Sequence, residues 1–267
     1  MTVSNSSIKA AAKSILKPNF INSIVATVIL LAVWFVCHNI SAVISLMAGS
    51  TAFYIAFLTF ALFIISPVAM GLIRFFWRMN FGQIDNPIDV FYYFASKEIY
   101  LKVLHLVFAI AIRTVICFLI FSIPVYVLQL ITGTWIYNAL NVSIPIWTAN
   151  LSNLISFIRF ISTTATMVYV LKFYLAPMLF VADENMDIGE ALHLSTVISR
   201  RTMLDFIFLI FSFSGWILLS VLVVPLIITL PYMIVSYLIH CSFAVDAFNE
   251  EISKINHDDI PTFVAGT

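Results

Sequence analysis

Two arginines, Arg113 and Arg159, fall within long apolar stretches and are the first candidates for chemistry. A charge at the bilayer centre costs at least about 2.5–3.5 kcal/mol on insertion scales, so it needs a partner or a watery cavity. Of the thirteen acidic residues, only Asp205 and Asp246 come close enough to apolar stretches to act as partners. Arg113 therefore lines an ion or substrate path, or it snorkels towards the membrane surface, which is the commoner behaviour. For Arg159 we favour an interfacial position still more strongly.

Other reactive side chains do not form a recognisable site. Cys37 and His38 are neighbours near the start of the chain, and His240 and Cys241 are neighbours near its end. The expected topology places these pairs at different depths, so we expect packing and not a shared metal ion. Because no GxSxG, Walker, HExxH or CxxC pattern is present either, we predict no catalytic residue, no metal and no cofactor.

Small and hydroxylated residues gather in two places, at 162–166 (STTAT) and at 212–216 (SFSGW). Small residues let membrane helices approach closely, and hydroxyl groups can bond to backbone carbonyls within or between helices. A polar track for a transported substrate would have the same composition. The sequence leaves both interpretations open, with packing the commoner one.

The composition shows which environment must hold these residues. The chain has 267 residues, of which 62% are hydrophobic and only 10% charged, and its mean hydropathy is +1.07. Soluble domains carry about 25% charged residues, so most of this chain must lie in the lipid bilayer, which is its expected partner. The formal net charge is zero, which gives a nucleic acid no electrostatic footprint.

Apolar runs long enough to cross a membrane predict an all-α, polytopic transmembrane bundle that forms a single domain over residues 1–267. A span needs about 20 apolar residues. Six runs qualify, at residues 20–46, 52–73, 103–130, 152–180, 204–224 and 226–247. The fourth is too long to cross as one straight, untilted helix, so it must tilt, bend near Pro177 or lie partly in the interface.

Basic residues outside these runs lie at alternate ends of the spans. They precede the first run, occur between residues 74 and 102 and between residues 172 and 201, and follow the sixth run. The segments 47–51, 131–150 and 225–231 contain no charged residue. With six spans, the positive-inside rule makes the basic side cytoplasmic. We therefore predict a multi-pass protein of the cell membrane with both termini in the cytoplasm.

Three short amphipathic helices are expected on the cytoplasmic side, each leading into a span. The second begins at Asn86-Pro87 with an N-cap and a proline at the first helical position, and the third begins with an Asp187 N-cap. The pattern suggests three parallel units, 1–84, 85–182 and 183–267, although such matches also arise by chance. The candidate surface for lipid or a partner protein comprises Ile88, Phe91, Tyr92, Ile188, Leu192, Arg200 and Arg201.

The ordered motifs 174–177 (YLAP), 190–192 (EAL), 200–203 (RRTM), 212–216 (SFSGW) and 231–232 (PY) support a family resemblance, together with the opening 8–17 (IKAAAKSILK). With these motifs the chain resembles the domain of unknown function 975 family of bacterial, mostly Gram-positive, membrane proteins. The chain departs from the family at 168–171 (VYVL), where a Pro-Gly bend is common, and at 248–249 (FN), where an aromatic pair is common. The resemblance implies a bacterial cell membrane and supplies no catalytic residues.

Three functional classes remain. The first is a non-enzymatic accessory, assembly or regulatory protein that binds a membrane protein partner or a second copy of itself through its amphipathic helices. The second is a small transporter or channel that uses Arg113 and the Ser/Thr track, although the near-absence of embedded carboxylates argues against a proton relay. The third, lipid handling, ranks lowest, and no nucleophile–base pair supports a lipid-cleaving enzyme.

Overall fold

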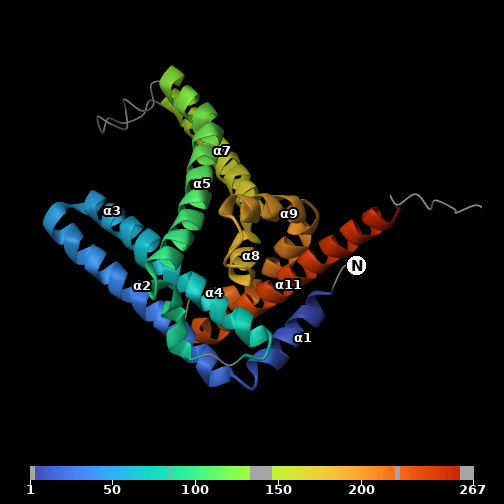
Figure 1. Ribbon diagram of the computed structural model, residues 1–267. Helices are drawn as coiled ribbons and strands as arrows, with labels where there is room; N and C mark the ends of the chain where they lie inside the picture. The colour runs from blue at the N-terminus through green and yellow to red at the C-terminus, as the bar shows by residue number, and fades with distance from the viewer. Residues whose placement is uncertain (1–3, 84–85, 133–145, 220–222, 259–267) are drawn as a thin grey trace, which may run out of the picture. The chain divides into compact units, whose positions relative to one another are not determined.

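The computed structural model describes residues 4–83, 86–132, 146–219 and 223–258, which form helices and no strand (Figure 1). The helices are α1 (Asn5–Leu16), α2 (Phe20–Ala48), α3 (Ser50–Phe60), α4 (Ser66–Asn80), α5 (Lys97–Thr132), α7 (Ile146–Val170), α8 (Ala176–Ala182), α9 (Ile188–Phe211), α10 (Ser214–Leu219) and α11 (Val223–Asp258). A π-helical turn η1 (Ala61–Ile65) and two 3-10 segments, η2 (Pro87–Phe94) and η3 (Leu171–Phe173), complete the order. The predicted all-α class is confirmed.

Five helical stretches among these residues are long and apolar enough to cross a membrane. They are Phe20–Ala48, Ser50–Asn80, Lys97–Leu130, Asn153–Ala182 and Pro225–Glu251. Many of their large side chains face outwards, as Phe35 (62% exposed), Tyr54 (70%) and Leu130 (72%) do. A helix that exposes such side chains needs lipid as its solvent. The protein is an integral, multi-pass membrane protein.

The predicted span 204–224 has a different form. Its first part continues without a break from the predicted third amphipathic helix, so that both belong to α9. The helix ends at Phe211, and α10 begins after Ser212 and Phe213. Residues 220–222 of this run, and most of the predicted outer segment 131–150, lie outside the described residues.

The chain divides into two compact units, each described here by itself. The first comprises residues 1–106 and 175–267, and the second comprises 107–174. These boundaries differ from those of the three predicted repeats, 1–84, 85–182 and 183–267, so the repeat stays a prediction. The predicted starts at Asn86 and Asp187 are confirmed, because each side chain accepts a hydrogen bond from a backbone N–H of its own first turn.

In the first unit, α2 and the α3–α4 stretch form a hairpin (Figure 1). The reversal occurs at Gly49, whose φ of +87° lies in the region that favours glycine. Further along, Pro67 has no N–H to donate to the carbonyl of Phe63 four residues earlier. The hydroxyl of Tyr100 on α5 donates to that carbonyl at 2.9 Å, so this bond links η1 to α5.

Segment η2 lies against α4 at very short range. A Cβ atom added to Gly71 would come within 1.9 Å of the carbonyl oxygen of Val90. Only glycine therefore permits this approach. Val90 and Tyr93 are fully buried, whereas Ile88 is 65% exposed, so η2 has one face in the core and one outside.

In the second unit, the later part of α5 and α7 run side by side (Figure 1). Ser162 on α7 joins them, because its hydroxyl donates to the carbonyl of Phe121 on α5 at 2.7 Å. The helices expose many other apolar side chains, including Ile116, Phe157 and Phe160. This pair of helices therefore has the surface of a lipid-facing hairpin.

Candidate functional site

The amphipathic helix α1 is the element that builds the best-formed site. Its residues Ile8, Ala12 and Leu16 recur at a helical period and are buried, and this face packs against α11. The period fits the predicted first amphipathic helix. The lysines of α1 lie off the buried face, with Lys13 in the last turn and Lys17 at the C-cap, where the helix dipole favours a positive charge.

Lys9 fixes the position of α1 within the first unit. Its ammonium group donates to the carbonyl of Ser212 at 2.7 Å, at the break between α9 and α10. The same nitrogen lies 4.3 Å from the ring centre of Phe213, and the hydroxyl of Tyr232 on α11 donates to the carbonyl of Lys9 at 3.3 Å. The cation thus satisfies a helix-terminal carbonyl and adds a cation–π contact.

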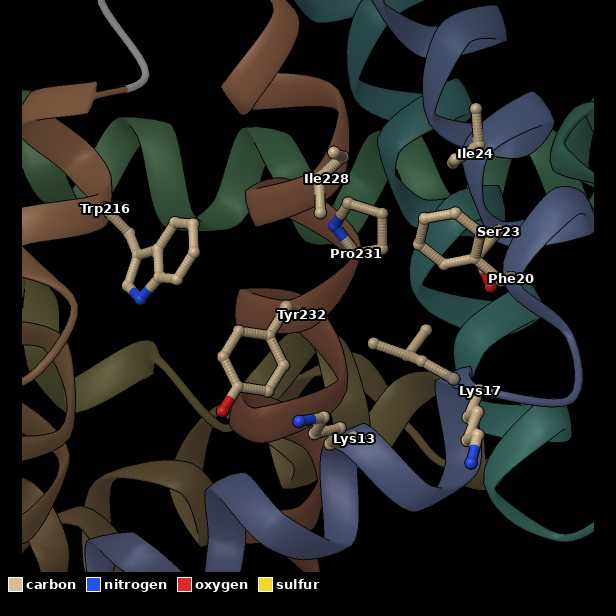
Figure 2. A pocket seen from close by; sticks show the side chains of 10 residues that line it. Lys13, Lys17, Phe20, Ser23, Ile24, Trp216, Ile228, Pro231 and Tyr232 are labelled. Carbon is tan, nitrogen blue, oxygen red and sulfur yellow. The ribbon is translucent and has the colours of Figure 1, made fainter.

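Helix α1 ends beside a cavity of about 570 Å³, which we call the lysine cavity. It lies between the end of α1, the start of α2, α10 and α11, and is lined by Lys13, Leu16, Lys17, Phe20, Ser23, Ile24, Trp216, Ile228, Pro231 and Tyr232. Figure 2 shows the two lysines on the α1 side, with apolar and aromatic side chains across from them. Pro18 and Asn19 form the turn that brings Phe20 and Ile24 of α2 to this wall.

The lining combines an apolar chamber with a positive edge. None of its residues is acidic. Within the described part of the chain, neither the Lys13 nor the Lys17 ammonium group has a hydrogen-bond or ion-pair partner, and both residues are exposed. An apolar cavity with convergent charged groups at one end suits an amphiphile whose head is negative.

A second polar cluster joins η2, α4 and the loop before α9. The Arg74 Nε atom lies 3.0 Å from Glu184 Oε1, and the Tyr92 hydroxyl donates to Glu184 Oε2 at 3.1 Å. The Arg74 guanidinium also lies over the Tyr92 ring at 3.5 Å, and Lys102 donates to the carbonyl of Glu184 at 3.1 Å. These contacts hold η2 in place, and of their residues only Tyr92 was predicted from the sequence as part of a functional surface.

Electrostatics in this cluster keep both tyrosines protonated. Burial, then the charge and hydrogen bond of Glu184, raises the pKa of Tyr92 above its ordinary value. Burial also raises the pKa of Tyr93, strongly. The hydroxyl of Tyr93 is buried and has no hydrogen-bond partner among the described residues. The cluster is therefore a structural lock with one unsatisfied group.

The four embedded or edge candidates do not form one site. Arg113 and Arg159 belong to the second unit, and Asp205 and Asp246 belong to the first. Arg113 is exposed and donates to the carbonyl of Ala109 at 3.1 Å, in its own helix, with its guanidinium 6.0 Å from the Phe173 ring. Arg159 is exposed on α7. The contacts of Arg113 favour a snorkelling side chain.

The predicted surface residues separate into exposed and buried groups. Ile88 and Phe91 are exposed, and so are Arg200 and Arg201, of which Arg201 pairs with Glu251. The prediction is wrong for Ile188 and Leu192, whose side chains are 7% and 3% exposed. They lie in the core because the start of α9 packs on α8 and does not lie alone on the membrane.

The remaining candidates have packing roles in their local contacts. Thr163, Thr164 and Thr166 each donate to the carbonyl four residues earlier on α7, which satisfies the hydroxyls without a polar path. The ring of His38 stacks on Trp34 at 5.4 Å, and that of His240 stacks on Phe206 at 5.8 Å. In the described ranges, no three His, Cys, Asp or Glu residues are grouped so that they could hold a metal ion.

Comparisons with protein-family models, with curated proteins and with solved structures found no match to this chain. The resemblance to the domain of unknown function 975 family therefore stays a prediction that rests on the motifs given above.

Proposed function

We propose that this protein is a non-enzymatic lipid-handling protein that binds an anionic amphiphile in the lysine cavity. The observation that carries the proposal is the combination of an apolar chamber of about 570 Å³ with two unpartnered lysines at one edge, within the described residues. An acyl chain gains free energy when it leaves water for such a chamber. A phosphate or carboxylate head then lies within reach of Lys13 and Lys17.

The position of the cavity along the spans supports this proposal. Its residues Phe20 and Ile24 belong to the first turns of the stretch Phe20–Ala48, and α1 lies just before it. A cavity beside the start of a span, edged by an amphipathic helix, is at the depth where lipid head groups meet acyl chains. Lipid can then enter sideways from the bilayer.

Orientation in a bacterial cell membrane is part of the same proposal. The basic residues Lys13, Lys17 and Lys97 all lie at span ends in the first unit, and the positive-inside rule assigns such ends to the cytoplasm. We infer that the N-terminus is cytoplasmic and that the lysine edge of the cavity faces the inner leaflet. A cysteine introduced by Ser6→Cys should resist a membrane-impermeant maleimide in intact cells, and rapid labelling would contradict this orientation.

Native mass spectrometry of the protein extracted in a mild detergent tests the binding. We expect phosphatidylglycerol to stay bound to the wild type and the Lys13→Gln/Lys17→Gln variant to lose most of it, because only the charged edge changes. Ile228→Trp should also lower occupancy, since its larger side chain fills the chamber. Lys97→Gln is the matched control, because Lys97 is exposed and does not line the cavity. Equal lipid retention in all four proteins would refute the proposal.

A competition experiment distinguishes which class of anionic amphiphile the cavity binds. Phosphatidylglycerol and free fatty acid share an anionic head on an aliphatic chain, and both fit the lining. If dodecanoate displaces phosphatidylglycerol from the wild type at comparable concentration, the site recognises the anionic amphiphile in general. If only phospholipid is retained, the second acyl chain or the glycerol contributes to recognition.

A second candidate function, an accessory role, is favoured by the outer face of η2. Ile88, Phe91 and Phe94 are 65%, 38% and 42% exposed on a segment that is anchored from behind by the Arg74–Glu184 pair. A rigid apolar ridge of this kind can bind a partner's groove or a second copy of the chain. Ile88→Gln/Phe91→Gln should remove a co-purifying protein, with Leu204→Gln, an exposed apolar residue outside η2, as the control. An unchanged set of co-purifying proteins would count against this role.

A further inference from the structure

The opposite face of α1 borders a second cavity, of about 550 Å³, which we call the Asp246 cavity. Ala11 and Ile15 of α1 line it, four residues apart and therefore on one helical face. Lys13 and Lys17, which line the lysine cavity, lie on the opposite side of the helix at 100° per residue. Both cavities belong to the first unit. Helix α1 therefore separates two chambers.

The Asp246 cavity has the reverse charge of the lysine cavity. Its one ionisable lining residue is Asp246, near the end of α11, and none of its lining residues is basic. In the part of the chain that the structure describes, the Asp246 carboxylate has no ion-pair or hydrogen-bond partner. The site therefore presents an uncompensated negative charge beside an apolar wall.

Aromatic rings complete the site. Trp77 and Phe81, at the end of α4, both line the cavity, with ring centres 4.9 Å apart and planes at 71°. The faces of aromatic rings attract cations, and tryptophan does so most strongly. The amide of Asn80 adds an acceptor at the same end. A carboxylate in one cavity with two aromatic rings is an arrangement that can recognise an ammonium group.

The depth of the cavity in the membrane indicates the chemistry of the rest of the ligand. Two apolar stretches end at this cavity, at Asn80 and Ala182, and Asp246 lies five residues before the end of a third, Pro225–Glu251. The remaining walls are aliphatic, with Met178 and Ile239 among them. The ligand therefore has its head at the membrane surface and an aliphatic chain towards the interior.

We propose that the Asp246 cavity is a second binding site, for an amphiphilic cation with an ammonium head and an aliphatic chain. The site is separate from the lysine cavity, and its charge preference is opposite. The protein thus takes amphiphiles of both signs on the two faces of one helix. The shared chemistry covers membrane lipids with amine heads and soluble alkylammonium compounds.

Equilibrium dialysis of radiolabelled dodecyltrimethylammonium, with the protein in uncharged dodecyl maltoside micelles, tests the proposal. Protein-free micelles give the background. We expect saturable binding to the wild type that weakens about fivefold in Asp246→Asn, which corresponds to the loss of one partly exposed ion pair. Asp205→Asn is the matched control, because Asp205 is exposed on α9 and does not line this cavity. Dodecanoate, with the same aliphatic chain type and a negative head, should not compete.

Two further measurements complete the design. Lys13→Gln/Lys17→Gln should leave cation binding unchanged, so a failure of the proposed function and a failure of this site give different results. Competition by lysophosphatidylethanolamine would identify a lipid as the occupant, and its failure to compete would identify a soluble alkylammonium compound. The absence of a saturable component in the wild type, or equal affinity in wild type and Asp246→Asn, would overturn the proposal. Unfolding temperatures confirm that each variant is folded.

Discussion

In the first unit, polar side chains form bonds between distant segments as well as within single helices, whereas those described in the second unit bond mostly within their own helix. The long-range bonds include those of Arg74 with Glu184 and of Lys9 with Ser212. In the second unit, the hydroxyls of Thr163 and Thr164 bond to carbonyls of their own helix. Locally satisfied helices can face lipid directly, because they leave no polar group exposed to it. Both proposed sites lie among the segments of the first unit that these long-range contacts join.

The largest expected effect comes from Gly71, where η2 approaches α4. Gly71→Ala should lower the free energy of unfolding by about 3 kcal/mol, because its Cβ would overlap the backbone of Val90 and not a movable side chain. Unfolding in mixed micelles with increasing sodium dodecyl sulfate measures the change.

Gly215 provides the control for this substitution. It lies in α10, and a Cβ added there would meet nothing within 4 Å. Gly215→Ala should therefore be neutral or stabilise the helix by up to about 1 kcal/mol. Equal effects at both glycines would mean that the close approach of η2 does not contribute to stability.

The next effect concerns the ion pair that locks η2. Glu184→Gln should cost about 1–2 kcal/mol, because the Arg74 side chain is only 14% exposed and loses its charged partner. Glu251→Gln removes the exposed pair with Arg201 and should cost less than about 0.5 kcal/mol. The same unfolding measurement compares them. A larger loss at Glu251 would reverse the distinction between the buried lock and the surface pair.

Local signals in the sequence were enough to predict much of this fold. Apolar runs predicted the membrane helices, and the side chains of Asn86 and Asp187 predicted where two segments begin. Apolar runs and N-caps both depend on residues that are close together in the sequence, and periodicity and capping rules describe this range. The helix that begins after Asp187 was expected to be short, but it continues to Phe211, because no glycine or proline ends it earlier.

The sites could be predicted only in part. Asp246 was identified from its position near an apolar run, but its cavity depends on α1, α4 and α8 meeting α11. Arg74 and Glu184 are 110 residues apart, so no local pattern joins them. In the sequence, Lys13 and Lys17 indicate only the orientation of the first span. Their place in a cavity depends on Trp216 and Tyr232, which are about 200 residues away along the chain. Packing between distant segments has no signature in one sequence.

Removing an unsatisfied group should strengthen the first unit. Tyr93→Phe should raise stability by about 1 kcal/mol, because the buried hydroxyl has no partner among the described residues. Tyr92→Phe, the matched control, should lower stability by about 1 kcal/mol through loss of its bond to Glu184. Thermal unfolding in nanodiscs gives both signs. A destabilised Tyr93→Phe would indicate that the hydroxyl has a partner in the membrane, such as water.

The pH dependence of stability tests the same tyrosine. Burial raises the pKa of Tyr93 in the folded protein above the ordinary value of about 10. Above that pH the unfolded chain loses the proton and the folded chain keeps it, so stability falls as pH rises. Tyr93→Phe should lessen this fall, and Tyr92, whose pKa is also raised, accounts for part of the remainder. Identical slopes in wild type and variant would contradict the assignment to Tyr93.

The smallest effect belongs to the second unit, where Ser162 is the exception to local bonding. Its hydroxyl donates to Phe121 of α5 as well as to Ile158 of its own helix. Ser162→Ala should cost about 0.6 kcal/mol, the average for such bonds between membrane helices. Thr163→Val should be close to neutral, because Thr163 is exposed and bonds only within α7. If both substitutions cost the same, the bond between α5 and α7 adds nothing, and apolar packing alone holds this hairpin together.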